Sequence, residues 1–134
     1  MSPASINHIG IATDSLDKST PIWKALGFNI ESEKIVYEQG VKVRYLNGTG
    51  HTRIELLEPI SKDTPVGRFI DIRGVGVQQI AIDVDDIDKS ISILSDMGAK
   101  MINEEPIIGS EGNRIAFIHP SSCGGVLIEL VERQ

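Results

Sequence analysis

Four polar side chains that could bind a metal ion occur at matched places in the two halves of the chain. His8 opens a run of small and aliphatic residues, and Gln79 opens a similar run 71 residues later. Glu55 lies in an Ile-Glu-Leu sequence that returns 74 residues later around Glu129. Two carboxylates at equivalent positions, together with one imidazole, are typical of a site for a divalent cation.

The positions of Glu55 and Glu129 among aliphatic residues require an explanation. Each is flanked by aliphatic residues in a sequence that is typical of a β-strand. A carboxylate in the middle of a buried strand is costly unless it is paired or bound to a cation. The alternative is an exposed strand face with solvated glutamates, and for either glutamate alone the two interpretations are equally good. The matched placement of both, with His8, favours the cation site.

The doubled sequence predicts the same elements twice, in the order β-α-β-β-β. In the first half we expect strands over 6–12, 28–33, 41–47 and 51–58, and a helix between residues 15 and 26. In the second half we expect strands over 79–84, 100–104, 114–119 and 125–132, and a helix from residue 87 that is closed by Gly98. A short helical piece near 66–72 lies between them. Pro21 either starts the first helix late, with Thr20 as its cap, or makes its first turn irregular.

Alternation along the first strand indicates which side chains share a face. Ile9 and Ile11 point one way, so we expect them to pack on a helix. His8, Gly10 and Ala12 point the other way. One polar residue followed by two small ones leaves room for a bound group on that face.

Composition excludes several classes of protein. A chain of 134 residues is long enough for one domain. Its net charge of −6, with no basic stripe, argues against a nucleic-acid partner. No apolar run approaches the roughly 20 residues of a membrane span. One cysteine, Cys123, and no visible signal peptide lead us to expect a cytoplasmic protein.

Several motifs resemble those of the methylmalonyl-CoA epimerases, in the vicinal oxygen chelate superfamily that includes glyoxalase I. They are His8-Ile9-Gly10-Ile11-Ala12, Glu38-Gln39-Gly40-Val41, Ile54-Glu55-Leu56-Leu57-Glu58-Pro59, Asp85-Asp86-Ile87, Glu105-Pro106, Ile115-Ala116-Phe117-Ile118-His119-Pro120 and Gly124-Gly125-Val126-Leu127-Ile128-Glu129-Leu130. The resemblance covers essentially the whole chain. It implies an α+β fold, in which two tandem βαβββ modules form a curved, cup-shaped, eight-stranded mixed sheet with helices on its outer face. We therefore expect one domain over 1–134, with modules at about 5–59 and 76–134 and a connector at about 60–75.

The resemblance also implies an isomerase and assigns its site. The metal ligands of the family fall on His8, Glu55, Gln79 and Glu129. Glu38 corresponds to one catalytic base, and Glu129 is the candidate for the opposite face of the substrate. The implied reaction interconverts (2R)- and (2S)-methylmalonyl-CoA through a metal-stabilised enolate, and the implied assembly is a homodimer.

Two hydroxyls complete the set of candidate residues. Ser121 and Ser122 follow His119 in a turn rich in small residues. They are our candidates for binding the carboxylate of the acyl-CoA substrate.

The chain departs from the family at one ligand. The epimerases usually have two consecutive histidines where this sequence has Gln78-Gln79, and the second is the ligand. An amide oxygen is a weaker donor to zinc than imidazole, so we expect Co²⁺, Mn²⁺ or Mg²⁺ rather than Zn²⁺. Two alternatives stay open: a glyoxalase-I-like enzyme, and a non-catalytic binding member of the superfamily.

Overall fold

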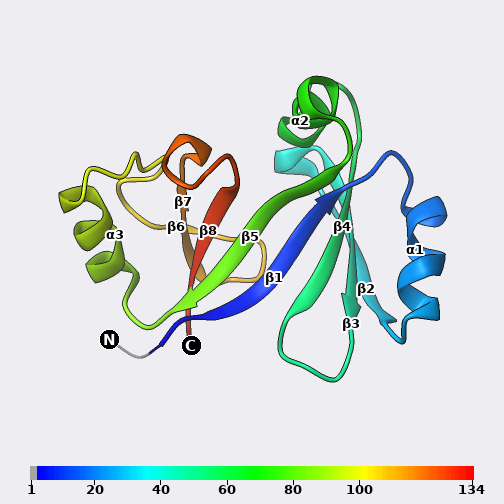
Figure 1. Ribbon diagram of the computed structural model, residues 1–134, viewed down its shortest axis with the longest axis horizontal. Coiled ribbons are helices and arrows are strands. Elements are labelled where there is room, and N and C mark those ends of the chain that lie inside the picture. The colour runs from blue at the N-terminus through cyan, green and yellow to red at the C-terminus, as the bar shows by residue number, and fades with distance from the viewer. Residues whose placement is uncertain (1–2) are drawn as a thin grey trace. The chain divides into compact units, whose positions relative to one another are not determined.

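The computed structural model describes residues 3–134, and it contains the predicted order of elements, with one strand placed differently from the prediction (Figure 1). The first module consists of β1 (Ser5–Ala12), α1 (Leu16–Ala25), β2 (Asn29–Val36), a 3₁₀ turn η1 (Tyr37–Gln39), β3 (Val41–Asn47) and β4 (Arg53–Pro59). The second consists of β5 (Gly76–Val84), α3 (Ile87–Asp96), β6 (Ile107–Ile108), β7 (Arg114–Ile118), η2 (Pro120–Ser122) and β8 (Leu127–Glu132). Helix α2 (Pro65–Arg73) lies in the connector.

Both modules have the same strand topology, as expected from the repeat in the sequence. In hydrogen-bonded order the strands of the first module are β2-β3-β4-β1, and those of the second are β6-β7-β8-β5. The pairs β1·β4 and β5·β8 are parallel, whereas the other pairs within each module are antiparallel. The predicted α+β class, with tandem βαβββ modules and eight strands in a mixed arrangement, is confirmed.

The chain forms two compact units, whose boundary falls close to that of the modules. One is His8–Gln78, and the other comprises Gln79–Gln134 with the start of β1 up to Asn7. That the whole chain behaves as one domain stays a prediction, and residues 1 and 2 of that predicted domain lie outside the described part.

In the first unit, opposite faces of the strands pack on different helices. Ile9 and Ile11 pack with Leu16 and Trp23 of α1, as the alternation predicts. On the face that carries Ala12, β3 and β4 pack instead against α2 of the connector. That cluster contains Ala12, Val41, Val43, Tyr45, Leu57 and Val66, with Val36, Phe69 and Ile70 beside it.

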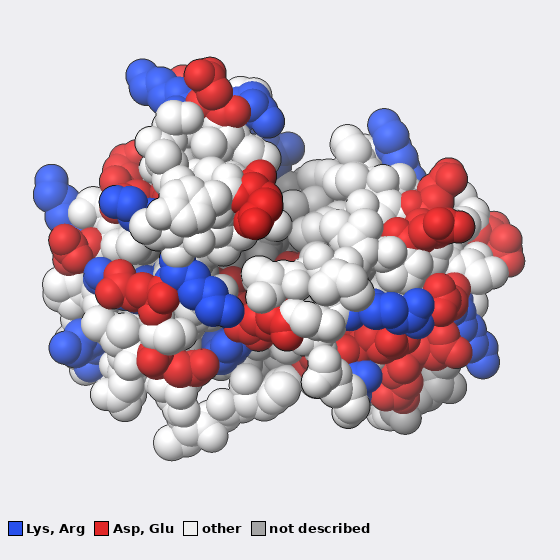
Figure 2. All heavy atoms as spheres, turned by 180° about the vertical axis from the view of Figure 1, so that it is seen from behind, with Lys and Arg blue, Asp and Glu red and all other residues white. Residues whose placement is uncertain are grey.

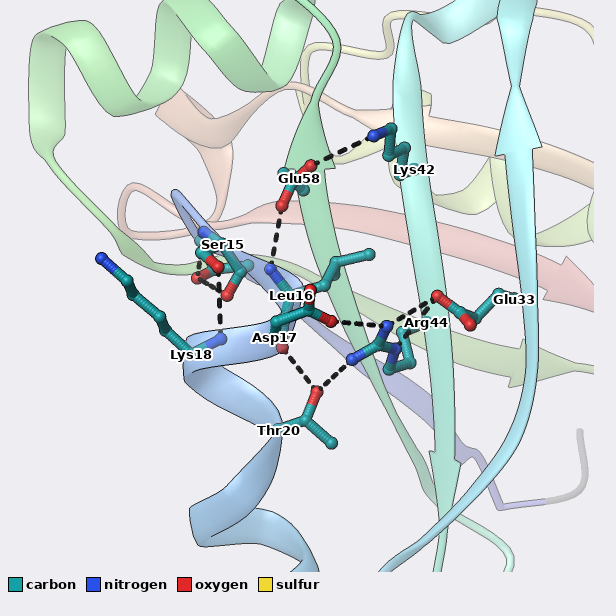
Figure 3. A network of polar contacts seen from close by, with 10 residues as sticks. Ser15, Leu16, Asp17, Lys18, Thr20, Glu33, Lys42, Arg44 and Glu58 are labelled. Carbon is teal, nitrogen blue, oxygen red and sulfur yellow. Dashed lines mark hydrogen bonds and ion pairs between the residues drawn. The ribbon is translucent and has the colours of Figure 1, made fainter.

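Polar contacts fix α1 on its module (Figure 3). The guanidinium of Arg44 on β3 donates to Asp17 at 3.2 Å and to Thr20 at 2.8 Å, both on the helix. The same guanidinium donates to Glu33 on β2 at 2.8 Å. These bonds hold the helix, and the loop that leads into it, at the edge of the sheet.

Helix α1 starts earlier than one of our two alternatives allowed. Ser15 is its N-cap and accepts from the backbone N–H of Lys18 at 3.2 Å. Pro21 lies inside the helix, so a start at Thr20 is wrong. The helix keeps its cap and its sheet contacts, and these outweigh the one hydrogen bond that Pro21 cannot make.

The strand expected at 100–104 is wrong. Only Met101 forms an isolated bridge, with Ile118, and the short strand β6 follows at Ile107–Ile108. The side chain of Asn103 explains the difference, because its Oδ1 accepts from the backbone N–H of Phe117 at 2.9 Å. A side chain thus satisfies a donor that a regular ladder would pair with a backbone carbonyl.

Candidate active site

The first unit brings His8 and Glu55 together. His8 comes from β1 and Glu55 from the parallel neighbour β4, and both are less than a tenth exposed. His8 Nδ1 lies 3.0 Å from Glu55 Oε2. A buried carboxylate needs such a partner, because transfer from water without one is strongly unfavourable. The solvated strand face that we kept as an alternative is therefore wrong for Glu55.

Two neighbours of Glu55 were not predicted from the sequence. Tyr45 on β3 pairs with Glu55 across the strands and is 2% exposed. Arg53 places Nη2 3.7 Å from Glu55 Oε2 and its guanidinium carbon 5.1 Å from the centre of the Tyr45 ring. The signal was available, since Arg53 is two residues before Glu55 on one strand and so shares its face.

The second unit brings Gln79 and Glu129 together in the corresponding way. Gln79 is on β5 and Glu129 on its parallel neighbour β8. The amide Nε2 of Gln79 donates to Glu129 Oε1 at 3.3 Å. Both residues are half-buried.

Strand registers show that the two pairs are equivalent. Glu55 is opposite Gly10 on one side and Tyr45 on the other. Glu129 is opposite Ala81 and Phe117 in the same way. Each module therefore presents a histidine or glutamine, a glutamate, a small residue and an aromatic ring on one face.

The separation of the two facing atoms of His8 and Glu55 is compatible with binding to one cation. Two cis ligands of an octahedral ion at about 2.1 Å are roughly 3 Å apart, which is close to the separation of His8 Nδ1 and Glu55 Oε2. Gln79 would have to turn its amide oxygen toward the ion, and amide nitrogen and oxygen are assigned only from their hydrogen bonds. Over residues 3–134, no group of three or more His, Cys, Asp or Glu side chains is arranged to hold a metal.

Glu38 lies in the exposed 3₁₀ turn η1, just before β3. Gly40 closes that turn with a φ of 62°, and its N–H donates to the carbonyl of Tyr37 at 3.1 Å. The carbonyl of Gly40 accepts from Ile60 at 2.8 Å, directly after β4. The turn is thereby tied to the end of the strand that carries Glu55.

The two candidate serines already have hydrogen-bond partners, that of Ser121 within its own turn and that of Ser122 outside it. Ser122 Oγ accepts from the backbone N–H of Lys100 at 2.9 Å. Ser121 Oγ lies 2.8 Å from His119 Nδ1, which also accepts from the backbone N–H of Ser121 at 3.0 Å. In the same turn, burial raises the pKa of the Cys123 thiol, so that it is not an activated nucleophile.

A hollow in the first unit lies away from His8 and Glu55. It has a volume of about 330 Å³ and is lined by Glu33, Lys34, Ile35, Lys42 and Val43 on β2 and β3. Its lining contains no residue of the predicted site.

The surface charge is mixed in sign. Figure 2 shows acidic and basic side chains interspersed on one face, in a chain whose net charge is −6. No helix within the described residues is long and apolar enough to cross a membrane.

Comparison with known proteins identifies the family of the chain. Residues 7–117 match the Glyoxalase/Bleomycin resistance protein/Dioxygenase superfamily. The mitochondrial methylmalonyl-CoA epimerase of Bos taurus is 35% identical over 127 residues, which cover 93% of this chain and 72% of that protein. The chain belongs to this superfamily and to its methylmalonyl-CoA epimerase family.

Solved structures of the family superpose closely. Methylmalonyl-CoA epimerase from Mycobacterium tuberculosis has a TM-score of 0.86 and 36% identity, over 96% of this chain and 87% of that one. A methylmalonyl-CoA epimerase in complex with methylmalonyl-CoA and NH₄⁺ also has a TM-score of 0.86, with 37% identity over 98% and 95% of the two chains. The predicted family is confirmed, and with it the enzyme class, an isomerase.

Proposed function

We propose that this chain is a metal-dependent epimerase that interconverts (2R)- and (2S)-methylmalonyl-CoA. The observation that carries the proposal is that each module pairs two predicted ligands, His8 with Glu55 and Gln79 with Glu129. The bound methylmalonyl-CoA of a solved relative supports the choice of substrate.

The four donors define the kind of ion. One imidazole, one amide and two carboxylates form an oxygen-rich set, which suits Mn²⁺, Co²⁺ or Mg²⁺ better than Zn²⁺. When bound, such an ion would neutralise the negative charge that develops on the thioester oxygen.

Inversion at C2 needs two groups that act on opposite faces of the substrate. In one direction, the carboxylate of Glu38 takes the C2 proton and leaves an enolate. A carboxyl group on the other face, for which Glu129 is the candidate, returns a proton to C2. The reverse reaction uses the same two groups with their roles exchanged.

Substrate binding requires further groups. The hydroxyls of Ser121 and Ser122 are the candidates for donating to the free carboxylate of the substrate. Because both already have hydrogen-bond partners, Ser121 in His119 and Ser122 in Lys100, each would have to exchange a hydrogen bond on binding. Homodimer assembly and a cytoplasmic location stay predictions.

One observation favours a second candidate function. Gln79 stands where the family has a histidine ligand and donates its amide nitrogen to Glu129. If this pair holds no cation, the chain would be a binding protein of the superfamily that does no proton chemistry. A glyoxalase-I-like activity has no such observation in its favour.

The test is exchange of the C2 proton of methylmalonyl-CoA in D₂O, after elemental analysis of the purified protein. We expect exchange with Mn²⁺ or Co²⁺, and we expect Glu38→Gln to lower its rate by at least about 100-fold while metal binding is kept. Glu104→Gln, at an exposed position, is the matched control and should exchange at the normal rate. No exchange with any divalent ion would rule out the epimerase and leave the binding protein.

A further inference from the structure

Arg53 lies beside the predicted metal ligand Glu55, although it has no place in the proposed reaction. It is the first residue of β4 and is in register with His8 on β1. Its side chain is only 19% exposed. Burying a charged group is costly unless nearby groups compensate its charge. Three neighbours of Arg53 contribute to that compensation.

The three neighbours hold the guanidinium from different directions. Nη1 lies 3.3 Å from Glu31 Oε1 on β2, and Nη2 lies 3.7 Å from Glu55 Oε2. The ring of Tyr45 supports the plane of the group, at 5.1 Å from its central carbon. Arg53 is therefore shared between a carboxylate near the surface and the buried carboxylate of the site.

A cation at this distance affects any other cation that binds Glu55. Two positive groups next to one carboxylate repel each other, and in a partly buried site the repulsion is screened less than in water. Arg53 also neutralises part of the negative charge of Glu55, so that Glu55 attracts a metal ion less strongly. Both effects lower the affinity for a divalent metal.

We propose that Arg53 is an internal counter-cation that competes with the divalent metal for Glu55 and so sets the metal affinity of the site. The inference rests on the proposed function only in taking Glu55 as a metal ligand. Arg53 acts through Glu55 and is therefore a positioning residue.

Glu31 gives the proposal a second consequence, of opposite sign. Glu31 holds the other arm of Arg53 and also accepts from Asn47 Nδ2 at 3.2 Å. Removing its charge takes away a carboxylate that shares Arg53 with Glu55. Loss of Arg53 should strengthen metal binding, whereas loss of the Glu31 charge should weaken it.

The experiment measures Mn²⁺ binding to the full-length protein, from the electron paramagnetic resonance signal of the free ion, without substrate. We expect Arg53→Gln to bind Mn²⁺ at least about tenfold more tightly than the unchanged protein, and Glu31→Gln to bind it about threefold or more weakly. Arg53→Lys keeps the charge and should stay within about threefold of the unchanged protein.

Two control variants separate this effect from the general field of the protein. Lys34 lies over the same Tyr45 ring at 5.9 Å, so Lys34→Gln removes a neighbouring cation. Glu33 lies on the same strand as Glu31 but accepts from Arg44, so Glu33→Gln removes a neighbouring anion. Both should bind Mn²⁺ within about twofold of the unchanged protein.

The inference is overturned if Arg53→Gln binds Mn²⁺ no more tightly than the unchanged protein, or if Lys34→Gln tightens binding as much. Absence of Mn²⁺ binding in every variant overturns it as well. Failure of the proposed function is a separate result, namely that C2 exchange is absent with every metal. Tenfold tighter Mn²⁺ binding in Arg53→Gln, together with no exchange in the unchanged protein with any metal, would support the inference and refute the epimerase.

Discussion

Glu132 accepts a hydrogen bond from the backbone N–H of Ile87 at 3.0 Å, which joins the end of β8 to the first residue of α3. Glu58 makes the same bond to Leu16 at 2.9 Å in the first module. The repeat therefore preserves structural carboxylates as well as the candidate ligands. In both modules the strand that carries the site glutamate also caps the helix, three residues further along.

The bonds that Glu132 accepts from Arg114 and from Ile87 make stability depend on pH. Arg114, which donates to both carboxylate oxygens of Glu132, and then the Ile87 N–H lower the pKa of Glu132 from its ordinary 4.5. A group with a lowered folded-state pKa stabilises the protein above its ordinary pKa, and that stabilisation is lost as the pH falls through the lowered value. We expect Glu132→Gln to melt a few degrees lower near neutral pH, and the difference to shrink toward about pH 3.

Thermal melts of the two proteins between about pH 3 and pH 7 measure this difference. Glu104→Gln at an exposed position is the control, and its melting temperature should follow that of the unchanged protein. A difference for Glu132→Gln that is constant over this range would contradict the prediction.

Substitution of Glu58 and of Lys42 shows whether the hydrogen bond to the helix N-terminus or the ion pair stabilises α1. Glu58 accepts from Leu16 N–H and also lies 3.6 Å from Lys42 Nζ, whose side chain is half exposed (Figure 3). Glu58→Ala should cost about 1 kcal/mol, because a helix N-terminus loses a side-chain acceptor. Lys42→Ala should cost less than about 0.5 kcal/mol, because exposed ion pairs contribute little. Urea unfolding of both variants decides between the two, and equal losses would assign the stabilisation to the ion pair.

Alternation was enough to predict which faces of the strands meet a helix. Ile9 and Ile11 face α1, and Ile82 packs with α3, as their spacing indicates. The pattern could not locate β6, because the hydrogen bond of Asn103 to Phe117 depends on a residue 14 positions away. The strand propensity of residues 100–104 carries no information about a contact with so distant a residue.

The sequence repeat allowed the four candidate ligands to be predicted, but not their neighbours. Matching His8 with Gln79 and Glu55 with Glu129 predicted one set of four metal ligands, which stays a prediction. The structure adds that His8 pairs with Glu55, and Gln79 with Glu129. Tyr45 was missed because its place opposite Glu55 follows from the strand register, which the sequence does not state. The partner of Ser121 was missed because it lies within a turn of irregular backbone, and that of Ser122 because Lys100 is 22 positions away.

Gly40 holds the turn that carries Glu38. Its φ of 62° is unfavourable for other residues, and an added Cβ would overlap the side-chain methyl of Thr64. Gly40→Ala should therefore destabilise the protein by about 1–3 kcal/mol and lower the exchange rate through displacement of Glu38. Gly50→Ala is the control, because a Cβ there meets nothing within 4 Å. Normal stability and exchange in Gly40→Ala would mean that the turn does not position a base.

Gln79 is the predicted ligand at which we expect this chain to differ from its family. An imidazole binds Zn²⁺ and Co²⁺ more strongly than an amide oxygen does, so Gln79→His should raise the affinity for both ions by about tenfold or more. Mg²⁺ prefers oxygen donors, so its affinity should stay level or fall. Calorimetric titration with each ion measures the change.

Gln78→His is the matched control for this substitution. Gln78 precedes Gln79 on β5, so its side chain points to the opposite face of the strand. If Gln78→His tightens Co²⁺ binding as much as Gln79→His, the new imidazole acts outside the predicted site. If only Gln79→His does so, the amide at this position accounts for a metal preference that separates this chain from relatives with histidine there.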